Sequence, residues 1–349
     1  MFLAWNEIKR NKLKFSLIIG VLIMISYLLF LLSGLASGLI NMNREGVDKW
    51  HADAIILNND ANQTVEQSLF NEEDVKDTYK KQTTLKQAGV IVSNGNVEEN
   101  ALLFGVTDNS FLIPKMIEGK KFTSNNEVIA DETLKEKNFK IGDKLSLSQS
   151  DEILKIVGFS ESAKYNASPV LFANNDTIAK INPSLAKTKT NAVVVKDKDW
   201  KDKDLNNNLE AIGIERFVKN LPGYQAQNLT LNFMISFLFV ISATVIGIFL
   251  YVITLQKTNL FGVLKAQGFT NGYLAKVVLS QTFIIALIGT IIGLLLTLVT
   301  GSFLPSAVPI KFSAVTLIVY GIVLIIVSLI GSLFSILTIR KVDPLKAIG

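Results

Sequence analysis

The sequence contains no cysteine and a single histidine, His51, in 349 residues. Without cysteine there is no disulfide and no Cys-based zinc site, and one histidine cannot supply the pair that an HExxH metal site needs. The chain also lacks a GxxxxGK[ST] phosphate loop and a GxSxG nucleophile elbow, so it has neither the P-loop ATP-binding motif nor that of α/β-hydrolases. We therefore expect no catalytic residues, no metal site and no enzymatic activity in this chain.

Charge is absent from four long apolar segments, residues 15–40, 231–255, 277–300 and 314–339. About 20 helical residues cross the hydrocarbon core of a bilayer, and each segment is at least that long. The sequence therefore predicts four transmembrane helices. The lack of carboxylates and basic side chains within them argues against a proton-coupled carrier, which needs such groups inside the membrane.

The first apolar segment follows a basic flank, as the apolar region of a signal peptide does. That region is about 7–15 residues long in signal peptides, whereas residues 15–40 form a much longer run. We expect a retained membrane anchor. The preceding residues 1–14, with Trp5 and Ile8 among their apolar side chains, are predicted to form an amphipathic helix at the cytoplasmic interface.

Lysine and arginine residues set the predicted orientation, because cytoplasmic loops of membrane proteins are enriched in them. Residues 1–14 carry four, residues 256–276 and the tail 340–349 carry three each, and the loop 301–313 carries only one. Both termini and residues 256–276 are therefore expected in the cytoplasm of a multi-pass plasma-membrane protein. Residues 41–230 and the loop 301–313 are expected outside.

The net charge of +5 follows the same division. Residues 41–230 contain 24 Lys and Arg residues against 28 Asp and Glu residues, so the positive excess belongs to the cytoplasmic edges. The basic character is thus a consequence of topology, and we expect no nucleic-acid partner.

Residues 41–230 are long enough for an independent domain. Short β-rich runs alternate there with turn residues and with two helical candidates, residues 71–81 and 205–213, which predicts an α+β fold. The passage 127–159 predicts a strand, a short helix, a Gly-Asp turn and a two-stranded hairpin. The β-rich runs are DAIIL, AGVIVSNGN, NALLFGV, NEVIAD, KLSLS, ILKIVGF, SPVLFA and NAVVVKD.

The predicted cytoplasmic segment 256–276 is longer than a connection between two membrane helices needs to be. It contains an amphipathic stretch, which fits two roles from the residues alone. It can place apolar side chains in a groove on a partner protein, or it can lie on anionic lipid with its lysines towards the headgroups.

A family resemblance favours the first role. The sequence QKTNLFGVLKAQGF, from Gln256 to Phe269, resembles the E-I-G-I-L-K-A-x-G motif of the FtsX/MacB permease superfamily, although Asn259 stands where an acidic residue is common. The tail IRKVDPLKAIG resembles the closing motif of that superfamily. Residues 127–147 resemble the strand, helix and Gly-Asp passage of its outer domain. One helix, a large outer domain and three further helices is also the order of the superfamily, so the resemblance covers essentially the whole chain.

The resemblance implies a type VII-like ABC permease, which works as a homodimer with separate cytoplasmic ATPase subunits that bind ATP. It also implies that residues 256–276 contain a coupling helix that docks on the ATPase. The coupling residues that follow from this match are Leu260, Phe261, Gly262, Val263, Leu264, Lys265 and Gly268.

Pairs of small residues four positions apart let membrane helices approach closely. Three such pairs lie in the predicted membrane helices: Gly34 with Gly38, Gly289 with Gly293, and Ala243 with Gly247. In the superfamily the first two helices line the dimer interface, so Gly34 and Gly38 are the candidates for dimer contact.

Three passages most resemble the haem-exporting HrtB-type branch of the superfamily. They are the start MFLAWNEIKRNKLKFSLIIGVLIMISYLLFLLSGLASGLI, YNASPVLF at 165–172 and LPGYQAQNLTL at 221–231. This resemblance implies haem contact by Trp50, Tyr165 and Tyr224, because aromatic faces stack on the macrocycle and Tyr can ligate iron. His51 is a further candidate ligand, and Met42 and Met234 are weaker ones. The alternative is that Trp50 and Tyr224 are interfacial belt residues and that Tyr165 is a half-buried strand residue.

The resulting hypothesis is an ABC efflux permease that expels haem from the membrane or its outer leaflet by mechanical transmission, with haem as substrate and no permanently bound cofactor. Two alternatives stay open: a mechanotransmission permease that controls an extracellular partner, and an exporter of peptide antibiotics or lipids. An amphiphile exporter should bind its ligand near the membrane, whereas a mechanotransmitter should bind a protein on its outer domain.

Overall fold

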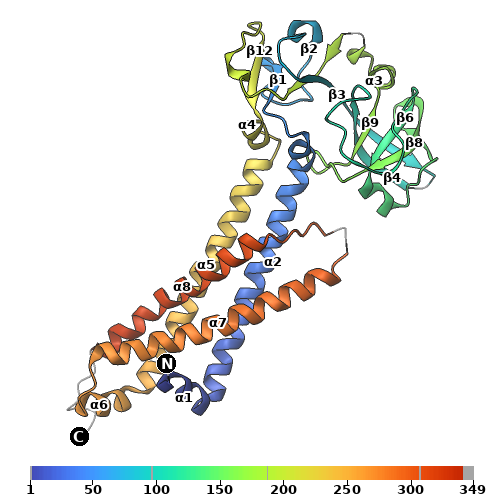
Figure 1. Cartoon of the computed structure of the whole chain (residues 1–349). Coiled ribbons are helices and arrows are strands. Elements are labelled where there is room, and N and C mark those ends of the chain that lie inside the picture. Colours follow the sequence, from blue (N-terminus) through green and yellow to red (C-terminus); the bar gives the residue numbers. More distant parts are fainter. Residues whose placement is uncertain (1, 96, 187, 306–307, 341–349) are drawn as a thin grey trace. The chain divides into compact units, whose positions relative to one another are not determined.

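The computed structural model describes residues 2–95, 97–186, 188–305 and 308–340. The chain divides into two compact units (Figure 1). We call Met1–Gly38 together with Asn228–Gly349 the membrane unit, and Leu39–Gln227 the outer unit. The predicted cytoplasmic tail, apart from its first residue, lies outside the described residues.

Among the described residues, four helices are long and apolar enough to cross a membrane, as the sequence predicts. The helices are longer than the apolar segments, because polar residues at their ends continue the helix. The C-terminal end of α2 and the N-terminal end of α5 belong to the outer unit. The four helices are α2 (Lys12–Trp50), α5 (Tyr224–Gln256), α7 (Asn271–Phe303) and α8 (Ala314–Arg340).

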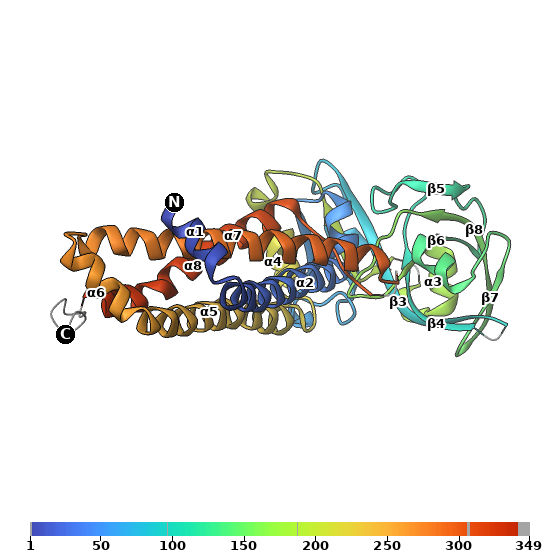
Figure 2. The same ribbon diagram turned by 90° about the horizontal axis from the view of Figure 1, so that it is seen from below.

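Two short helices complete the membrane unit, α1 (Phe2–Arg10) and α6 (Thr258–Ala266). The predicted segment 256–276 therefore contains α6 and also the first turns of α7. The reason is a helix cap: the Thr270 hydroxyl accepts a hydrogen bond from the Tyr273 N–H at 3.2 Å, so α7 begins directly after it. Figure 2 shows α6 between the ends of α5 and α7.

Glycines bring the membrane helices together, as the small-residue pairs predict. A Cβ atom on Gly293 of α7 would lie 2.0 Å from the Ser26 Oγ of α2, and one on Gly331 of α8 would lie 2.3 Å from the Ala243 carbonyl oxygen of α5. Such distances are far below contact distance, so only glycine fits at these crossings.

The pair Gly34 and Gly38 is used within the chain as well. A Cβ atom on Gly38 would lie 1.9 Å from the Pro309 carbonyl oxygen, and one on Gly34 would lie 2.3 Å from the Phe312 ring. Residues 309–312 therefore cover this face of α2. Dimer contact at Gly34 and Gly38 stays a prediction, and in this single chain residues 309–312 occupy that face of α2.

The outer unit is built on one sheet of ten of the described strands. Their order is β12-β1-β11-β3-β4-β9-β6-β8-β5, with β7 paired to both β3 and β8; most pairs are antiparallel, whereas β4 with β9 and β6 with β8 are parallel. The strands are β1 (Ala54–Asn58), β3 (Gln82–Asn94), β4 (Val97–Gly105), β5 (Met116–Gly119), β6 (Glu127–Asp131), β7 (Lys144–Leu147), β8 (Ser150–Ser160), β9 (Val170–Ala173), β11 (Ala192–Val195) and β12 (Leu209–Gly213). The shorter elements are β2 (Phe70–Asn71), β10 (Lys189–Thr190), α3 (Asn175–Ile181) and α4 (Ile214–Lys219).

The strand predictions hold, and both helix predictions in the outer unit are wrong. Residues 209–213 form β12, which pairs with β1 and places Ile212 opposite Ile55 in the core. Residues 72–75 form only a 3₁₀ turn after β2. At residues 209–213, pairing within the sheet overrides the local helix preference. The passage 127–159 follows the prediction, with β6, a 3₁₀ turn, Gly142 at φ +95° and the β7–β8 hairpin.

Candidate ligand groove and coupling surface

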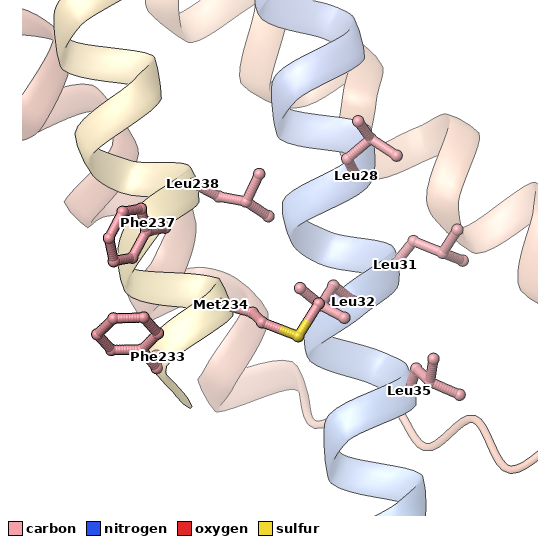
Figure 3. A pocket seen from close by; sticks show the side chains of 8 residues that line it. All are labelled: Leu28, Leu31, Leu32, Leu35, Phe233, Met234, Phe237 and Leu238. Atoms are coloured by element: carbon pink, nitrogen blue, oxygen red, sulfur yellow. The ribbon is translucent and has the colours of Figure 1, made fainter. Parts of the chain in front are cut away.

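An apolar groove lies between α2 and α5 in the membrane unit (Figure 3). Its volume is about 490 Å³, within the range of small-molecule sites. Met234 and Leu238 point from α5 towards α2. The lining residues are Leu28, Leu31, Leu32, Leu35, Phe233, Met234, Phe237 and Leu238.

The groove offers aromatic faces at the surface of the membrane unit. The rings of Phe233 and Phe237 lie 4.6 Å apart, and these side chains are 64% and 52% exposed. Met234, which is 47% exposed, carries the only atom among the lining side chains that can ligate a metal, its thioether sulfur. The groove residues of α5 lie at the start of the predicted membrane segment 231–255, which places them nearest the outer unit along the chain.

The aromatic residues predicted for haem contact lie elsewhere, in the core of the outer unit. Trp50 and Tyr165 are each 1% exposed and stack with their ring centroids 6.3 Å apart, and Phe104 packs edge-on against Tyr165 at 5.6 Å. Tyr224 belongs to the same core cluster and is buried. His51 is exposed and adopts a left-handed conformation at φ +48°.

The burial of these side chains determines which of them can contact haem in this conformation. Trp50 and Tyr165 present no free ring face to a macrocycle, and burial, with the charge of Glu66 adding to it, raises the pKa of the Tyr165 phenol well above its ordinary value. A phenol that resists ionisation is a poor iron ligand. Haem contact at Trp50, His51, Tyr165 and Tyr224 stays a prediction, and for the buried rings it requires the aromatic cluster to open.

The turn that carries Tyr165 is fastened to α2. Asn166 and Ala167 both adopt positive φ, +48° and +65°, and their N–H groups donate to the Asn43 and Met42 carbonyl oxygens at 3.0 and 3.1 Å. Positive φ is strained for alanine. The hydrogen bonds to the helix hold the turn in this conformation, so the Tyr165 ring is placed by the end of α2.

The helix α6, which is predicted to be the coupling helix, ends in a Schellman motif. Gly268 adopts φ +93°, its N–H donates to the Lys265 carbonyl at 2.9 Å, and the Phe269 N–H donates to the Leu264 carbonyl at 3.1 Å. Glycine is needed at the left-handed position. The glycine of the predicted motif therefore stops α6 and turns the chain into α7.

The structure divides the predicted coupling residues into two groups. Leu260 and Val263 are 51% and 39% exposed, whereas Phe261 is 4% exposed and packs with Leu274 of α7 and Ile336 of α8. Gly262 is buried, and Leu264 and Lys265 are half-buried. The inward residues anchor the helix, and only the outward ones can meet a partner.

Sequence reasoning missed two further exposed aromatic residues beside α6. Phe269 and Tyr273 are 39% and 42% exposed, with ring centroids 5.1 Å apart. They lie in the turn after α6 and the first turn of α7, which the predicted segment covered without singling them out. We define the coupling surface as the exposed apolar side chains Leu260, Val263, Phe269 and Tyr273.

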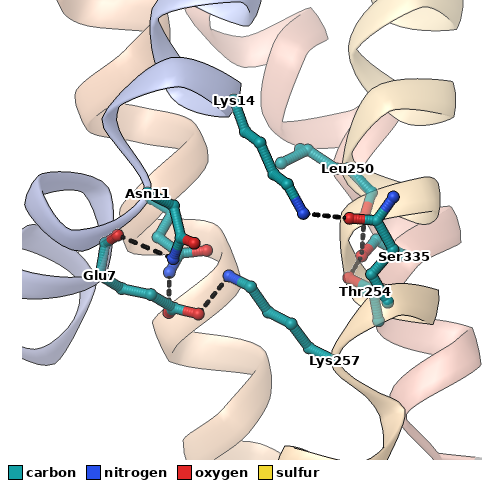
Figure 4. A network of polar contacts seen from close by, with 9 residues as sticks. Glu7, Asn11, Lys14, Leu250, Thr254, Lys257 and Ser335 are labelled. Carbon is teal, nitrogen blue, oxygen red and sulfur yellow. Dashed lines mark hydrogen bonds and ion pairs between the residues drawn. The ribbon is translucent and has the colours of Figure 1, made fainter.

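Polar contacts hold the start of α6 beside this surface (Figure 4). Glu7 of α1 forms an ion pair with Lys257, the residue directly before α6, and Lys14 of α2 donates to the side chain of Gln256, the last residue of α5. A cavity of about 540 Å³ lies between the two helices, lined by polar residues of α1 and by apolar residues of α6 and α7. The helix α1 thus lies across a cavity from α6 and is tied to its start by the Glu7–Lys257 ion pair.

Comparison with known proteins agrees with this architecture. Residues 232–344 match the FtsX-like permease C-terminal family. A protein of Staphylococcus haemolyticus, provisionally named hemin transport system permease protein HrtB, is 27% identical over 100% of this chain and 99% of its own length. A protein of the same name from Staphylococcus epidermidis is also 27% identical over 100% of this chain. An uncharacterized ABC transporter permease of Mycobacterium tuberculosis is 22% identical over 76% of this chain and 73% of its own length.

Two solved structures are similar to about half of the chain. The periplasmic region of MacB from Actinobacillus actinomycetemcomitans is 16% identical, covers 51% of this chain and 94% of its own, and has a TM-score of 0.37. The extracellular domain of the transporter YknZ from Gram-positive bacteria is 11% identical, covers 46% of this chain and 98% of its own, and has a TM-score of 0.35.

Proposed function

We propose that this chain, an ABC transporter permease whose residues 232–344 form an FtsX-like domain, exports haem or a similar flat amphiphile from the outer leaflet. The groove between α2 and α5 takes the ligand directly from the lipid. The observation that carries the proposal is this groove, an apolar site of about 490 Å³ with exposed aromatic rings in the membrane unit. The HrtB-named relatives make haem the first ligand to test.

The groove selects by stacking and ligation rather than by the hydrophobic effect. Lipid tails are as apolar as leucine, so a ligand already dissolved in the bilayer gains little from apolar contact alone. Aromatic stacking on the rings of Phe233 and Phe237 adds about 0.5–1.5 kcal/mol each beyond area burial. The Met234 thioether is of a type that ligates haem iron. These three side chains distinguish a planar macrocycle from a lipid.

The energy for export comes from a cytoplasmic ATPase subunit that the permease family implies. In our proposal both termini and α6 are cytoplasmic, the coupling surface docks on the ATPase, and two copies of the chain work together. ATP binding moves α6, and the connected membrane helices change the width of the groove. Such a change needs a helix bundle with two arrangements that nucleotide biases.

The proposal is tested by titrating the purified chain in lipid nanodiscs with haem and following the Soret band. We expect a saturable shift, with affinity about tenfold weaker in Phe237→Ala, which corresponds to about 1.4 kcal/mol. Met234→Ala should change the position of the band if the sulfur ligates iron. The matched control is Phe303→Ala, which removes an 83% exposed ring of α7 outside the groove.

Three outcomes contradict the proposal in different ways. A wild-type protein that is folded but gives no saturable shift does not bind haem. Equal weakening in Phe237→Ala and Phe303→Ala places the ligand outside the groove. Binding of a protein to the outer unit, together with no ligand affinity, favours the mechanotransmission alternative.

A further inference from the structure

Glu7 is the only carboxylate among the described residues of the membrane unit. Of the 30 acidic residues in the chain, 28 lie in residues 41–230, and Asp343 lies outside the described residues. The Glu7 side chain is only 17% exposed. A carboxylate placed there must be matched by specific partners, because burying a charge without them is costly.

Both oxygens of the Glu7 carboxylate are used, and each reaches a different helix. Oε1 pairs with the Lys257 ammonium, which is 15% exposed, and Oε2 accepts a hydrogen bond from the Gln281 amide of α7. Gln281 is 3% exposed. Figure 4 shows the ion pair between α1 and the start of α6. One side chain of α1 therefore fastens α6 and α7 together.

Lys257, the lysine of this ion pair, lies where α6 begins. The Lys257 carbonyl accepts the hydrogen bond of the Phe261 N–H at 2.9 Å, so this residue begins the first turn of α6. Its ammonium also lies 5.3 Å from the centroid of the Phe15 ring of α2, a cation–π distance. Displacing Lys257 would therefore move the start of α6 relative to the bundle.

The neighbouring residue fixes α1 to the same place. Ile8 is 9% exposed and belongs to an apolar cluster with Phe15 and Ile18 of α2 and Ile285 of α7. A helix that only lay on lipid would not need a buried ion pair on this side. The exposed Trp5 still suits the membrane interface.

We propose that Glu7 is a positioning residue for coupling. Its carboxylate holds the first turn of α6 against α1 and α7, so that a displacement of α6 moves the helix bundle instead of bending the link between α5 and α6. A partly buried ion pair of this kind fixes geometry more than it adds stability, and loss of one partner leaves the other uncompensated. The proposal rests on the proposed function in one respect, the docking of an ATPase on α6.

The test measures the distance between α1 and α6 in the full-length chain in nanodiscs. Since the chain contains no cysteine, Lys9→Cys and Ala266→Cys supply the only two nitroxide labelling sites, and both residues are exposed. With the labelled chain diluted in excess unlabelled chain, so that label pairs within one chain dominate, pulsed electron–electron double resonance should give one narrow distance distribution in the otherwise unchanged chain. Glu7→Gln, which keeps a hydrogen-bonding side chain but removes the charge, should broaden it.

Three further variants sharpen the result. Lys257→Gln removes the same ion pair from the other side and should give the same broadening. The charge reversal Glu7→Lys with Lys257→Glu should restore the narrow distribution. Lys12→Gln removes an exposed charge at the start of α2 and should leave it unchanged. With the ATPase bound, Glu7→Gln should also raise the amount of ATP hydrolysed per ligand exported.

An unchanged distribution in Glu7→Gln and Lys257→Gln would overturn the proposal, and so would a charge reversal that stays as broad as the single variants. The distance measurement involves no haem. A chain that fails to bind haem but shows the expected broadening therefore contradicts the proposed substrate and leaves the role of Glu7 standing.

Discussion

The two units of the chain are packed in opposite ways. The outer unit buries its large side chains, including Trp50 and Tyr165 at 1% exposed, and carries 52 of the 65 charged residues between positions 41 and 230. The membrane unit exposes large side chains, such as Phe303 at 83% and Phe334 at 67%, and brings its helices together at glycines. The membrane unit buries some large side chains as well, such as Phe30 at 0% exposed, but it differs from the outer unit in exposing many others.

The solvent explains the difference. In water, burial of apolar area stabilises the fold by about 25 cal/mol per Å². In lipid that driving force between helices disappears, and close van der Waals contact and hydrogen bonds hold them together. The Ser26 hydroxyl of α2 shows this, because it donates to the Gly289 carbonyl of α7 at 2.9 Å in a buried position.

The same contrast decides which aromatic residues are available to a ligand. Aromatic residues in the outer unit that look like ligand contacts in the sequence are core residues in the structure. Phe233 and Phe237 in the membrane unit look like ordinary lipid-facing residues in the sequence, and they line the groove.

Removing a large side chain should therefore have opposite consequences in the two units. Trp50→Ala should destabilise the outer unit by about 3–5 kcal/mol, the usual cost of truncating a buried aromatic residue. Phe237→Ala, half exposed in the membrane unit, should leave folding stability nearly unchanged. Thermal unfolding of both variants in the same detergent checks the comparison, which breaks down if they lose similar stability.

Adding a methyl group where α2 meets residues 309–312 should lower the free energy of unfolding by less than Trp50→Ala does, but by a measurable amount. Gly38→Ala places a Cβ atom 1.9 Å from the Pro309 carbonyl oxygen, and overpacking of this kind typically costs about 1–3 kcal/mol. The matched control is Gly20→Ala in the same helix, where no atom lies within 4 Å of the new Cβ. Equal melting temperatures for the two variants would show that the close approach does not stabilise the membrane unit.

A substitution at the C-terminal end of α6 should destabilise the chain less, and only locally. Gly268→Ala forces alanine to φ +93° and should cost about 1–2 kcal/mol, seen as faster amide exchange at the end of α6. Gly272→Ala is the control, since its Cβ would meet only the Thr270 hydroxyl at 3.9 Å. If both variants exchange alike, the Schellman turn does not determine where α6 ends.

The smallest effect on stability is expected for Asp197 in the outer unit, and it depends on pH. The Lys80 N–H and the Asp199 N–H both donate to the Asp197 carboxylate at 3.2 Å, and with the Lys80 ammonium they hold the pKa of Asp197 below its ordinary value. This contribution to stability is therefore complete above the unfolded-state pKa and is lost as pH falls through the lowered folded-state pKa.

Asp197→Asn should accordingly be less stable than the wild type at neutral pH and equal to it in strong acid. Urea unfolding at a series of pH values measures the difference. A difference that grows as the pH falls would contradict the sign, and Asp202→Asn, a change in the neighbouring 3₁₀ turn, serves as the comparison.

The sequence predicts those features of the fold that follow from the residues of a single segment. Long uncharged runs predict the four membrane helices, and the small-residue pairs predict where helices cross. The helix expected at residues 205–213 fails because its β pairing with β1 is a contact across about 150 residues of chain.

The candidate site is less predictable, since it depends on distant segments. The groove joins residues of α2 and α5 that are separated by the whole outer unit, and each is an ordinary apolar residue in its own helix. Glu7 stands out in the sequence as a lone acid among basic residues, but its partners, Lys257 and Gln281, follow only from the fold.

Export through the groove is tested most directly by ATP-dependent removal of haem from liposomes that contain the chain together with its ATPase. We expect haem to leave the bilayer only with hydrolysable ATP, and we expect Phe237→Ala to slow its release while Phe303→Ala does not. Release that is the same without ATP, or the same in both variants, would contradict export through the groove between α2 and α5.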